Sequence, residues 1–290
     1  MGMELPVSLV TVTEVGRVTP GTARVTFRAD TLPASVGAAP DQQVKLCFPR
    51  PGQDRPRLPA SDGDAMRWYQ AFLALPEDER PVMRSYTIRR RHPGTDLVDI
   101  DFVLHGDAGP ATRWAENAEP GQVLGMVGPS AEYARPLGEA DVLLLVGDET
   151  ALPALATLVE SLPEGVRAVA YVEVADAAEE QSFDTHADLT LHWLHRRTAR
   201  PGRSSILVEA VRRADLPSGS VFAWLAGEAG TVRALRRHLL DERGLDKHSV
   251  DFTGYWRLKL TQDDAPTEED LADAQEQLAR AREQAQASDW

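Results

Sequence analysis

The hydrophobic pattern of the chain changes character near residue 141, and this change constrains the fold more than any other feature. Before it, apolar and polar residues alternate in short runs separated by Pro-Gly pairs, as at 7–30 and 97–104. After it, continuous apolar runs such as 141–146 alternate with helical patterns. Period-two alternation is typical of antiparallel strands, whereas continuous runs suit parallel strands buried on both faces. The sequence therefore predicts an antiparallel β domain followed by an α/β domain.

Six strands are expected in the first half, two within 7–30 and then 42–48, 84–89, 97–104 and 122–128. Pro-Gly pairs beginning at Pro20, Pro93 and Pro120 suit the central positions of type II turns. We expect an antiparallel barrel that closes its own edges and ends near residue 137. Residues 49–82 interrupt the strands with prolines, charges and one helical stretch at 65–75. This excursion is either a lid over a ligand or, more simply, an inserted surface connection.

The second half predicts a doubly wound parallel sheet, because strand and helix patterns alternate. Strands are expected at 141–146, 168–174, 189–194, 221–226 and 249–255. Helices are expected from the turn at 147–153 to 162, at 205–214 and at 228–243. Ligands of such sheets bind at the carboxyl ends of the strands. Gly147, Asp148, Glu149 and Thr150 form a turn between the first strand and its helix, which is the layout of a nucleotide site without a Gly-x-Gly-x-x-Gly fingerprint.

The C-terminal stretch 267–287 predicts a helix with a narrow apolar stripe, formed by Leu271, Ala274, Leu278, Ala281 and Ala285. We expect this stripe to dock on the body of the protein rather than on another chain, because alanine-rich stripes bury little surface. The expected division is a barrel at 1–137, an α/β domain at 138–260 and a helical extension at 261–290.

Composition excludes several classes of protein. The chain has 290 residues, 42% of them apolar, which suffices for two cores. No apolar stretch approaches the roughly 18 residues of a membrane span, so we expect a soluble cytoplasmic protein. Cys47 is the only cysteine, so an internal disulfide, an iron–sulfur cluster and a cysteine zinc site are excluded. The formal charge of −14 argues against nucleic-acid binding.

Residues 84–89, RSYTIR, combine a strand pattern with the groups that a flavin nucleotide needs. Tyr86 can lie flat on an isoalloxazine ring, and Thr87 can hydrogen-bond its N5/O4 edge. An arginine fork such as Arg84 can hold the pyrophosphate in a bidentate manner. The alternative for these six residues alone is an ordinary barrel strand with solvated arginines.

The segment 105–115 indicates a second contact with such a nucleotide. Gly109 permits close approach of the backbone, and Pro110 suits the first position of a short helix, whose amino terminus favours a phosphate. Trp114 either stacks on an adenine or fills the core. His105 has no second histidine or cysteine spaced to join it, so we do not expect it to bind a metal.

Two arginines follow a strand of the second domain. Arg196 and Arg197 either meet the 2′-phosphate of NADPH or form a solvated strand end, and the sequence leaves both readings open.

Together these stretches resemble the siderophore-interacting protein family, flavin-dependent ferric-siderophore reductases with a ferredoxin-reductase-like fold. The motifs are RSYTIR at 84–89, DFVLHGDAGPATRWA at 101–115, LLLVGDETALPAL at 143–155, WLHRR at 193–197, WLAGEAGTVRALRR at 224–237 and GYWR at 254–257. The resemblance implies FAD binding by Arg84, Ser85, Tyr86, Thr87, His105, Gly109, Ala111, Thr112 and Trp114. It implies NADPH or NADH binding by Gly147, Asp148, Glu149, Thr150, Arg196, Arg197 and Glu228. After Trp256 the sequence departs from the family pattern, which puts the shape of the substrate pocket in doubt.

The implied chemistry is reduction of a ferric siderophore by NADPH or NADH through FAD. A nicotinamide delivers two electrons whereas Fe³⁺ accepts one, and a flavin can convert between them. Hard oxygen chelators hold Fe³⁺ better than Fe²⁺, so reduction releases the metal without any protein ligand for iron. Rival interpretations are a reductase of the same fold that serves a ferredoxin or free flavin, and a non-enzymatic siderophore carrier. We expect a monomer.

A basic island is expected for the substrate. Many ferric siderophores are anionic, and a protein of net charge −14 repels them unless cations gather near the flavin. We hypothesise that Lys45, Arg257 and Lys259 form this island. The alternative is that they are scattered surface charges.

Overall fold

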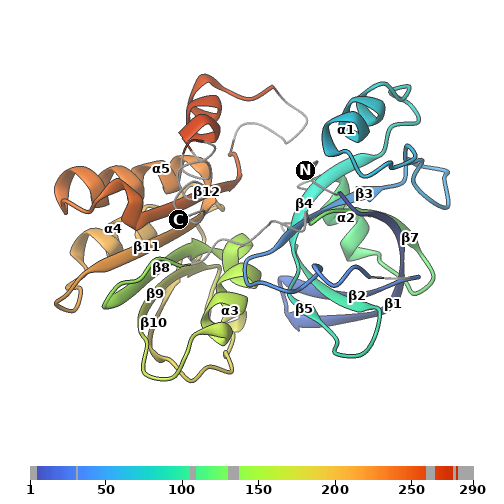
Figure 1. Cartoon of the computed structure of the whole chain (residues 1–290). Coiled ribbons are helices and arrows are strands. Elements are labelled where there is room, and N and C mark those ends of the chain that lie inside the picture. Colours follow the sequence, from blue (N-terminus) through green and yellow to red (C-terminus); the bar gives the residue numbers. More distant parts are fainter. Residues whose placement is uncertain are drawn as a thin grey trace.

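The computed structural model describes residues 5–30, 32–104, 109–129, 137–258, 265–276 and 279. Within them the chain forms a seven-stranded antiparallel sheet followed by a five-stranded parallel sheet. The two sheets and their helices form two bodies that lie side by side, with the antiparallel body on the right in Figure 1. This confirms the expected fold class. Within the described residues, no helix combines the length and the apolar character that crossing a membrane requires.

The antiparallel sheet contains the six expected strands and one short addition. Its strands are β1 (Val7–Thr19), β2 (Thr22–Ala29), β3 (Gln43–Phe48), β4 (Val82–Thr87), β5 (Arg90–Arg91), β6 (Leu97–Val103) and β7 (Val123–Val127), in the order β4-β3-β7-β1-β2-β6-β5. Alternate residues point into one apolar core, which includes Val10, Val25, Phe27, Leu46, Ile100 and Leu124.

The sheet is barrel-like, but the expected closure by a ladder is not detected among the described strands. Its two edge strands, β4 and β5, are consecutive in the chain. Ile88 still donates its N–H to Gln42 O next to β3 (2.8 Å), whereas Arg89 donates to Asp99 O of β6 (2.9 Å). The chain therefore leaves one partner strand for another between these two residues, and this switch creates β5 as a separate strand.

Two of the three Pro-Gly turns have the predicted geometry. Gly94 and Gly121 have positive φ angles of 70° and 92°, as the third position of a type II turn requires. The turn at 19–22 was predicted wrongly, because Gly21 does not have a positive φ. The N–H of Gly21 instead donates to Glu179 Oε1 of the second domain (2.7 Å).

The excursion at 49–82 lies over the outside of the barrel-like sheet. Its helix α1 (Ala65–Leu73) buries Trp68 and Phe72 against Cys47 of β3 and Val127 of β7. A second short helix, α2 (Pro110–Glu116), begins with Pro110 as expected.

The parallel sheet has the order β10-β9-β8-β11-β12. Its strands are β8 (Val142–Asp148), β9 (Arg167–Val174), β10 (Asp188–His195), β11 (Val221–Glu228) and β12 (Val250–Trp256). The helices are α3 (Leu152–Ser161), α4 (Ile206–Arg213) and α5 (Ala229–Arg237), with short turns of helix η1 (Glu149–Ala151), η2 (Ala177–Glu179), η3 (His238–Glu242) and η4 (Lys247–Ser249). Helix α3 packs on one face, and α4 and α5 pack on the other. The strand order reverses between β8 and β11, which makes their carboxyl ends the switch point of the sheet.

Buried polar contacts join the two domains. The Asp41 carboxylate, in the segment before β3, accepts from Trp224 Nε1 (3.0 Å) and Tyr255 OH (2.9 Å), and the Asp41 N–H donates to Thr157 Oγ1 (2.9 Å). The Arg89 guanidinium donates two hydrogen bonds to the Glu160 carboxylate of α3 (2.8 and 2.6 Å). These contacts join the first domain to α3, to the middle of β11 and to the end of β12.

Residues 268–276 form a helix that lies against the second domain. The half-buried positions are Thr267, Asp270, Asp273 and Glu276, whereas Leu271 is 50% exposed and Ala274 is exposed. The helix therefore docks by a polar, mostly acidic face, and the expectation that its apolar stripe docks was wrong for Leu271 and Ala274. Leu278, Ala281 and Ala285 lie outside the described residues.

Candidate functional site

The predicted flavin motif lies on β4, at one edge of the antiparallel sheet. Tyr86 pairs with Val44, and its ring packs against Phe102 (4.4 Å between ring centroids) and Phe48 (6.3 Å). Ser85 points to the other face, where Lys45 Nζ donates to its Oγ (2.8 Å). Burial raises the pKa of Tyr86 above its usual range, although the charge of Arg84 opposes this. Tyr86 is half-buried, with its ring against the edge of the aromatic core.

The turn into α2 offers a backbone that a ligand can approach. Gly109 precedes Pro110 with φ 132° and ψ 172°, a conformation that favours glycine, and no described atom lies within 4 Å of the position that a Cβ would occupy. Among the described residues, no side chain caps the amino terminus of α2. This geometry fits the predicted contact with a nucleotide phosphate. Thr112 is half-buried on the same turn, and Ala111 packs its side chain into the core.

Trp114 is part of the aromatic core. Its ring centroid lies 5.3 Å from that of Phe48, 5.5 Å from that of Phe102 and 6.2 Å from that of Phe27. Of the two readings left open by the sequence, the structure favours packing over adenine stacking. His105 lies outside the described residues.

The predicted nicotinamide residues meet at the switch point of the parallel sheet. Asp148, at the end of β8, accepts from the N–H (2.9 Å) and the hydroxyl (2.5 Å) of Thr150 through Oδ1. Its Oδ2 accepts from Glu228 N (2.8 Å) and Trp256 Nε1 (2.9 Å). One carboxylate therefore fastens the carboxyl ends of β8, β11 and β12 together.

Two glycines make this arrangement possible. A Cβ on Gly147 would lie 2.6 Å from Ala151 Cβ, and a Cβ on Gly227 would lie 2.6 Å from Asp148 Oδ2. Gly227 also has φ 136°, which favours glycine. The sequence marks Gly227 as the start of the turn 227–230, which follows an apolar strand and opens a helix, but it does not indicate the close approach to Asp148.

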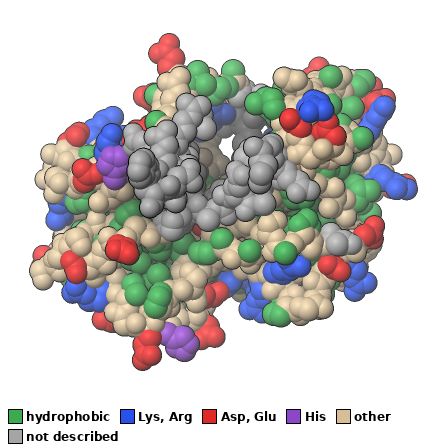
Figure 2. All heavy atoms as spheres, in the orientation of Figure 1, with side chains coloured by type: hydrophobic (Ala, Val, Ile, Leu, Met, Phe, Trp, Pro, Cys, Tyr) green, Lys and Arg blue, Asp and Glu red, His purple; other side chains and the backbone are tan. Residues whose placement is uncertain are grey.

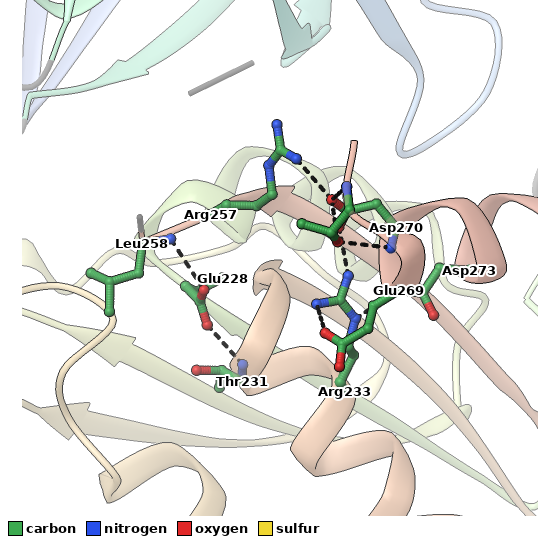
Figure 3. Close-up of polar contacts among 9 residues, drawn as sticks. Glu228, Thr231, Arg233, Arg257, Leu258, Glu269, Asp270 and Asp273 are labelled. Atoms are coloured by element: carbon green, nitrogen blue, oxygen red, sulfur yellow. Dashed lines mark hydrogen bonds and ion pairs between the residues drawn. The ribbon is translucent and has the colours of Figure 1, made fainter. Parts of the chain in front are cut away.

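Glu228 caps α5. Its Oε2 accepts from Thr231 N (2.8 Å), and its Oε1 accepts from Leu258 N (3.3 Å), as Figure 3 shows. Asp148 and Glu228 thus organise the backbone at the switch point, where the sequence predicted ligand contacts.

The two arginines after β10 have different surroundings. Arg196 forms a buried ion pair with Glu149, whereas Arg197 is exposed and has a positive φ of 56°. Burial raises the pKa of Glu149 to about 7, although the hydrogen bond from Arg196 opposes this rise. Arg196 is therefore committed to a carboxylate, and Arg197 is the one that reaches solvent.

The proposed substrate cations are only partly described. Lys45 is exposed, and its Nζ donates to Ser85 Oγ (2.8 Å). Arg257 donates to Asp270 Oδ2 (2.7 Å), and Lys259 lies outside the described residues. On the face seen in Figure 2, the Lys and Arg side chains of the described part are dispersed among Asp and Glu side chains rather than gathered in one patch. Among the residues that the structure describes, no group of three or more His, Cys, Asp or Glu residues could hold a metal ion.

Both halves of the chain match models of one protein family. Residues 11–133 match the siderophore-interacting FAD-binding domain, and residues 140–259 match the siderophore-interacting protein model. The chain belongs to the siderophore-interacting protein family. Relatives include the ferric vibriobactin reductase ViuB of Vibrio cholerae, which is 31% identical over 81% of this chain and 83% of its own length.

Solved structures of the family agree with this assignment. A siderophore utilization protein from T. fusca is 36% identical, with a TM-score of 0.78 over 91% of this chain and 97% of that protein. The siderophore-interacting protein SipS from Aeromonas hydrophila is 28% identical, with a TM-score of 0.69 over 96% and 99%. The first domain of this siderophore-interacting protein is thus an FAD-binding domain, and the geometry of Tyr86 and Gly109 fits that cofactor.

Proposed function

We propose that this siderophore-interacting protein is a reductase that uses FAD to pass electrons from NADPH or NADH to a ferric siderophore and releases iron as Fe²⁺. The observation that carries the proposal is the pairing of an FAD-binding domain with a second domain whose switch point is fastened by Asp148. A carrier of siderophores has no use for a second nucleotide site. The names of relatives, ferric vibriobactin reductase and ferric acinetobactin reductase, support the same activity.

The residues of the first domain hold and orient FAD in this proposal. Arg84 binds the pyrophosphate, Tyr86 covers one face of the ring system, and Ser85 and Thr87 reach its polar edge. Gly109 and Thr112 receive the phosphates at α2, and His105 joins them. When bound, FAD accepts a hydride and gives up electrons singly, which Fe³⁺ requires.

The residues of the second domain hold the nicotinamide nucleotide. Gly147 and Thr150 present the turn after β8, and Arg197 meets the 2′-phosphate of NADPH. Asp148, Glu149, Arg196 and Glu228 support this surface through their hydrogen bonds and ion pair. Their contribution is to hold the backbone in a shape that the nucleotide can bind.

Lys45, Arg257 and Lys259 attract the ferric chelate. The chelate supplies all oxygen ligands of the iron, so the protein needs to hold it near the flavin edge and to provide positive charge. We further propose that the protein works as a monomer in the cytoplasm, and that a reduced ferredoxin is the alternative electron donor.

Anaerobic stopped-flow reduction tests the proposal. The purified protein should be yellow, release FAD on denaturation and bleach with NADPH or NADH. Its colour should return when a ferric tris-catecholate is added, with Fe²⁺ captured by a ferrous chelator. Bleaching without reoxidation by any ferric chelate would favour a ferredoxin or free flavin as the acceptor. Binding of ferric chelates by a colourless protein would instead identify a carrier.

A further inference from the structure

Helix 268–276 holds three arginines of the second domain by ion pairs. Arg233 of α5 pairs with Glu269 (3.0 Å), Asp270 (2.6 Å) and Asp273 (2.9 Å), Arg236 pairs with Glu276 (2.7 Å), and Arg257 pairs with Asp270 (2.7 Å). Figure 3 shows Asp270 between Arg233 and Arg257. We call the helix together with the preceding Thr267 (residues 267–276) the acidic helix, and we call Arg233, Arg236 and Arg257 the arginine cluster. Four carboxylates thus neutralise three guanidinium groups.

The contact between the acidic helix and the body is mainly electrostatic. The side of the helix that faces the body carries Thr267, Asp270, Asp273 and Glu276, whereas Leu271 points to solvent. Apolar burial therefore adds little to docking. The paired side chains are 19–29% exposed, apart from Glu269 at 74%, so water and salt still reach these ion pairs and weaken them. A helix held in this way can be displaced by another anion.

Asp270 is the central residue of the contact. Its Oδ2 accepts from the N–H and the hydroxyl of Thr267 (both 2.8 Å), and the same carboxylate bridges Arg233 and Arg257. Partial burial opposes ionisation, but the hydrogen bonds from Thr267 and the two arginines outweigh it and hold the pKa of Asp270 well below its usual range. Asp270 is therefore a permanent anion at neutral pH.

The position of Arg257 connects this contact with the site. Arg257 lies between Trp256, whose Nε1 donates to Asp148, and Leu258, whose N–H donates to Glu228. The ion pair between Arg257 and Asp270 is thus next to the carboxyl ends of β8 and β11. Arg257 is also one of the cations assigned to the ferric chelate above.

We propose that the acidic helix is an autoinhibitory latch, in which Asp270 competes with an anionic ferric chelate for Arg257 and Arg233. This inference rests on the proposed function. A catecholate oxygen and the Asp270 carboxylate are both anionic acceptors for the same guanidinium groups, so the chelate must displace Asp270 to use them. A neutral chelate gains nothing from this exchange. The latch therefore lowers the affinity of the site for anionic chelates and leaves its affinity for neutral chelates unchanged.

Equilibrium dialysis of the oxidised, FAD-loaded, full-length protein tests the latch without turnover. The probes are a ferric tris-catecholate, which is anionic, and a neutral ferric tris-hydroxamate. Asp270→Asn should tighten binding of the tris-catecholate by about threefold or more at low salt, and the gain should shrink at high salt. Binding of the tris-hydroxamate should not change. Hydrogen exchange of residues 267–276 should become faster in this variant.

Asp273→Asn is the matched control. It makes the same chemical change one turn away and also removes a contact with Arg233, but Asp273 makes no described contact with Arg257. Its gain in affinity for the tris-catecholate should be smaller than that of Asp270→Asn, because the ion pair between Asp270 and Arg257 remains. If the parent binds the tris-catecholate and Asp270→Asn binds it equally well at low salt, the latch is overturned and the proposed function stands. If neither protein binds any ferric chelate, the proposed function fails and the latch fails with it.

Discussion

Asp148 accepts hydrogen bonds from three different segments at the carboxyl end of β8. A polar residue after a buried strand is equally suited to touch a ligand or to fasten the turns around it, and the sequence pattern is the same in both cases. The partners Glu228 and Trp256 are 80 and 108 residues away in the chain. Residue spacing therefore could not predict that Glu228 and Trp256 are the partners of Asp148.

Arg196 and Arg197 provide the first test at the scale of residues. Arg197→Ala should raise the KM for NADPH by about tenfold and leave the KM for NADH unchanged, since a charge-assisted contact contributes roughly 1.5–3 kcal/mol. Arg196→Ala should instead lower the Tm, because it leaves Glu149 buried without its partner. Steady-state kinetics with both nucleotides and thermal denaturation separate the two roles. Equal effects of Arg197→Ala on both nucleotides would contradict the phosphate contact.

Glu149 gives the second residue-scale prediction, a dependence of stability on pH. Its pKa is about 7 in the folded protein, raised from 4.5 mainly by burial. The folded state therefore retains a proton that the unfolded state releases. The stabilising contribution is full below about pH 4.5 and is lost as the pH rises through 7.

Thermal denaturation between pH 5 and 8 measures this contribution. Relative to Glu149→Gln, which cannot ionise, the parent should lose Tm between pH 5 and 7, and the loss should level off above pH 7. The corresponding loss in free energy of unfolding is at most about 1.4 kcal/mol for each pH unit. Glu164→Gln, on the exposed turn after α3, is the control and should follow the parent. Parallel Tm curves for the parent and Glu149→Gln would show that the carboxyl group does not titrate there.

At the scale of elements, the hydrophobic period and the turn residues predicted the strands well, because both signals depend only on residues that are neighbours in the sequence. β6 and β8 lie within a residue or two of their predicted bounds. The predictions that were wrong depend on contacts with residues far away in the sequence. Gly21 adopts its conformation beside Glu179, and the acidic helix docks by Asp270 because Arg233 faces it. An apolar stripe alone could not reveal a more favourable electrostatic partner.

The turn from β11 into α5 carries the third prediction. Gly227→Ala should lower the Tm by several degrees, because φ 136° is unfavourable for alanine and its Cβ would lie 2.6 Å from Asp148 Oδ2. It should also weaken binding of both nicotinamide nucleotides, since Asp148 must move. Gly244→Ala is the control, with φ 69° and open space around the Cβ, and should cost only about 1 kcal/mol. Similar losses in the two variants would exclude the clash with Asp148 as the cause.

At the scale of the whole molecule, polar contacts between distant residues hold the two domains together. Asp41 meets Trp224 and Tyr255, and Arg89 meets Glu160. In the sequence, Arg89 belongs to a motif that suggests phosphate binding, yet its side chain is buried in an ion pair with the second domain. Local patterns identify domains, but they contain no information on how two domains face each other.

The last prediction concerns this interface. Asp41 is buried with φ 52°, so Asp41→Asn preserves the backbone, which asparagine tolerates, while it removes the negative charge that accepts from Trp224 and Tyr255. Hydrogen bonds to a charged acceptor contribute about 1.5–3 kcal/mol, and a neutral amide keeps only part of this. Scanning calorimetry should show a lower Tm and a broader transition, as the two domains begin to unfold separately.

Tyr255→Phe is the matched control for Asp41→Asn. It removes one donor and leaves the hydrogen bond between Trp224 and the Asp41 carboxylate in place, so the buried indole N–H keeps its charged acceptor. Its loss of Tm should be smaller, and its transition should stay as sharp as that of the parent. If Asp41→Asn also unfolds in one sharp transition at the parental Tm, the Asp41 contacts do not couple the domains. The coupling would then rest on the ion pair of Arg89 with Glu160 and on the hydrogen bonds that Glu179 accepts.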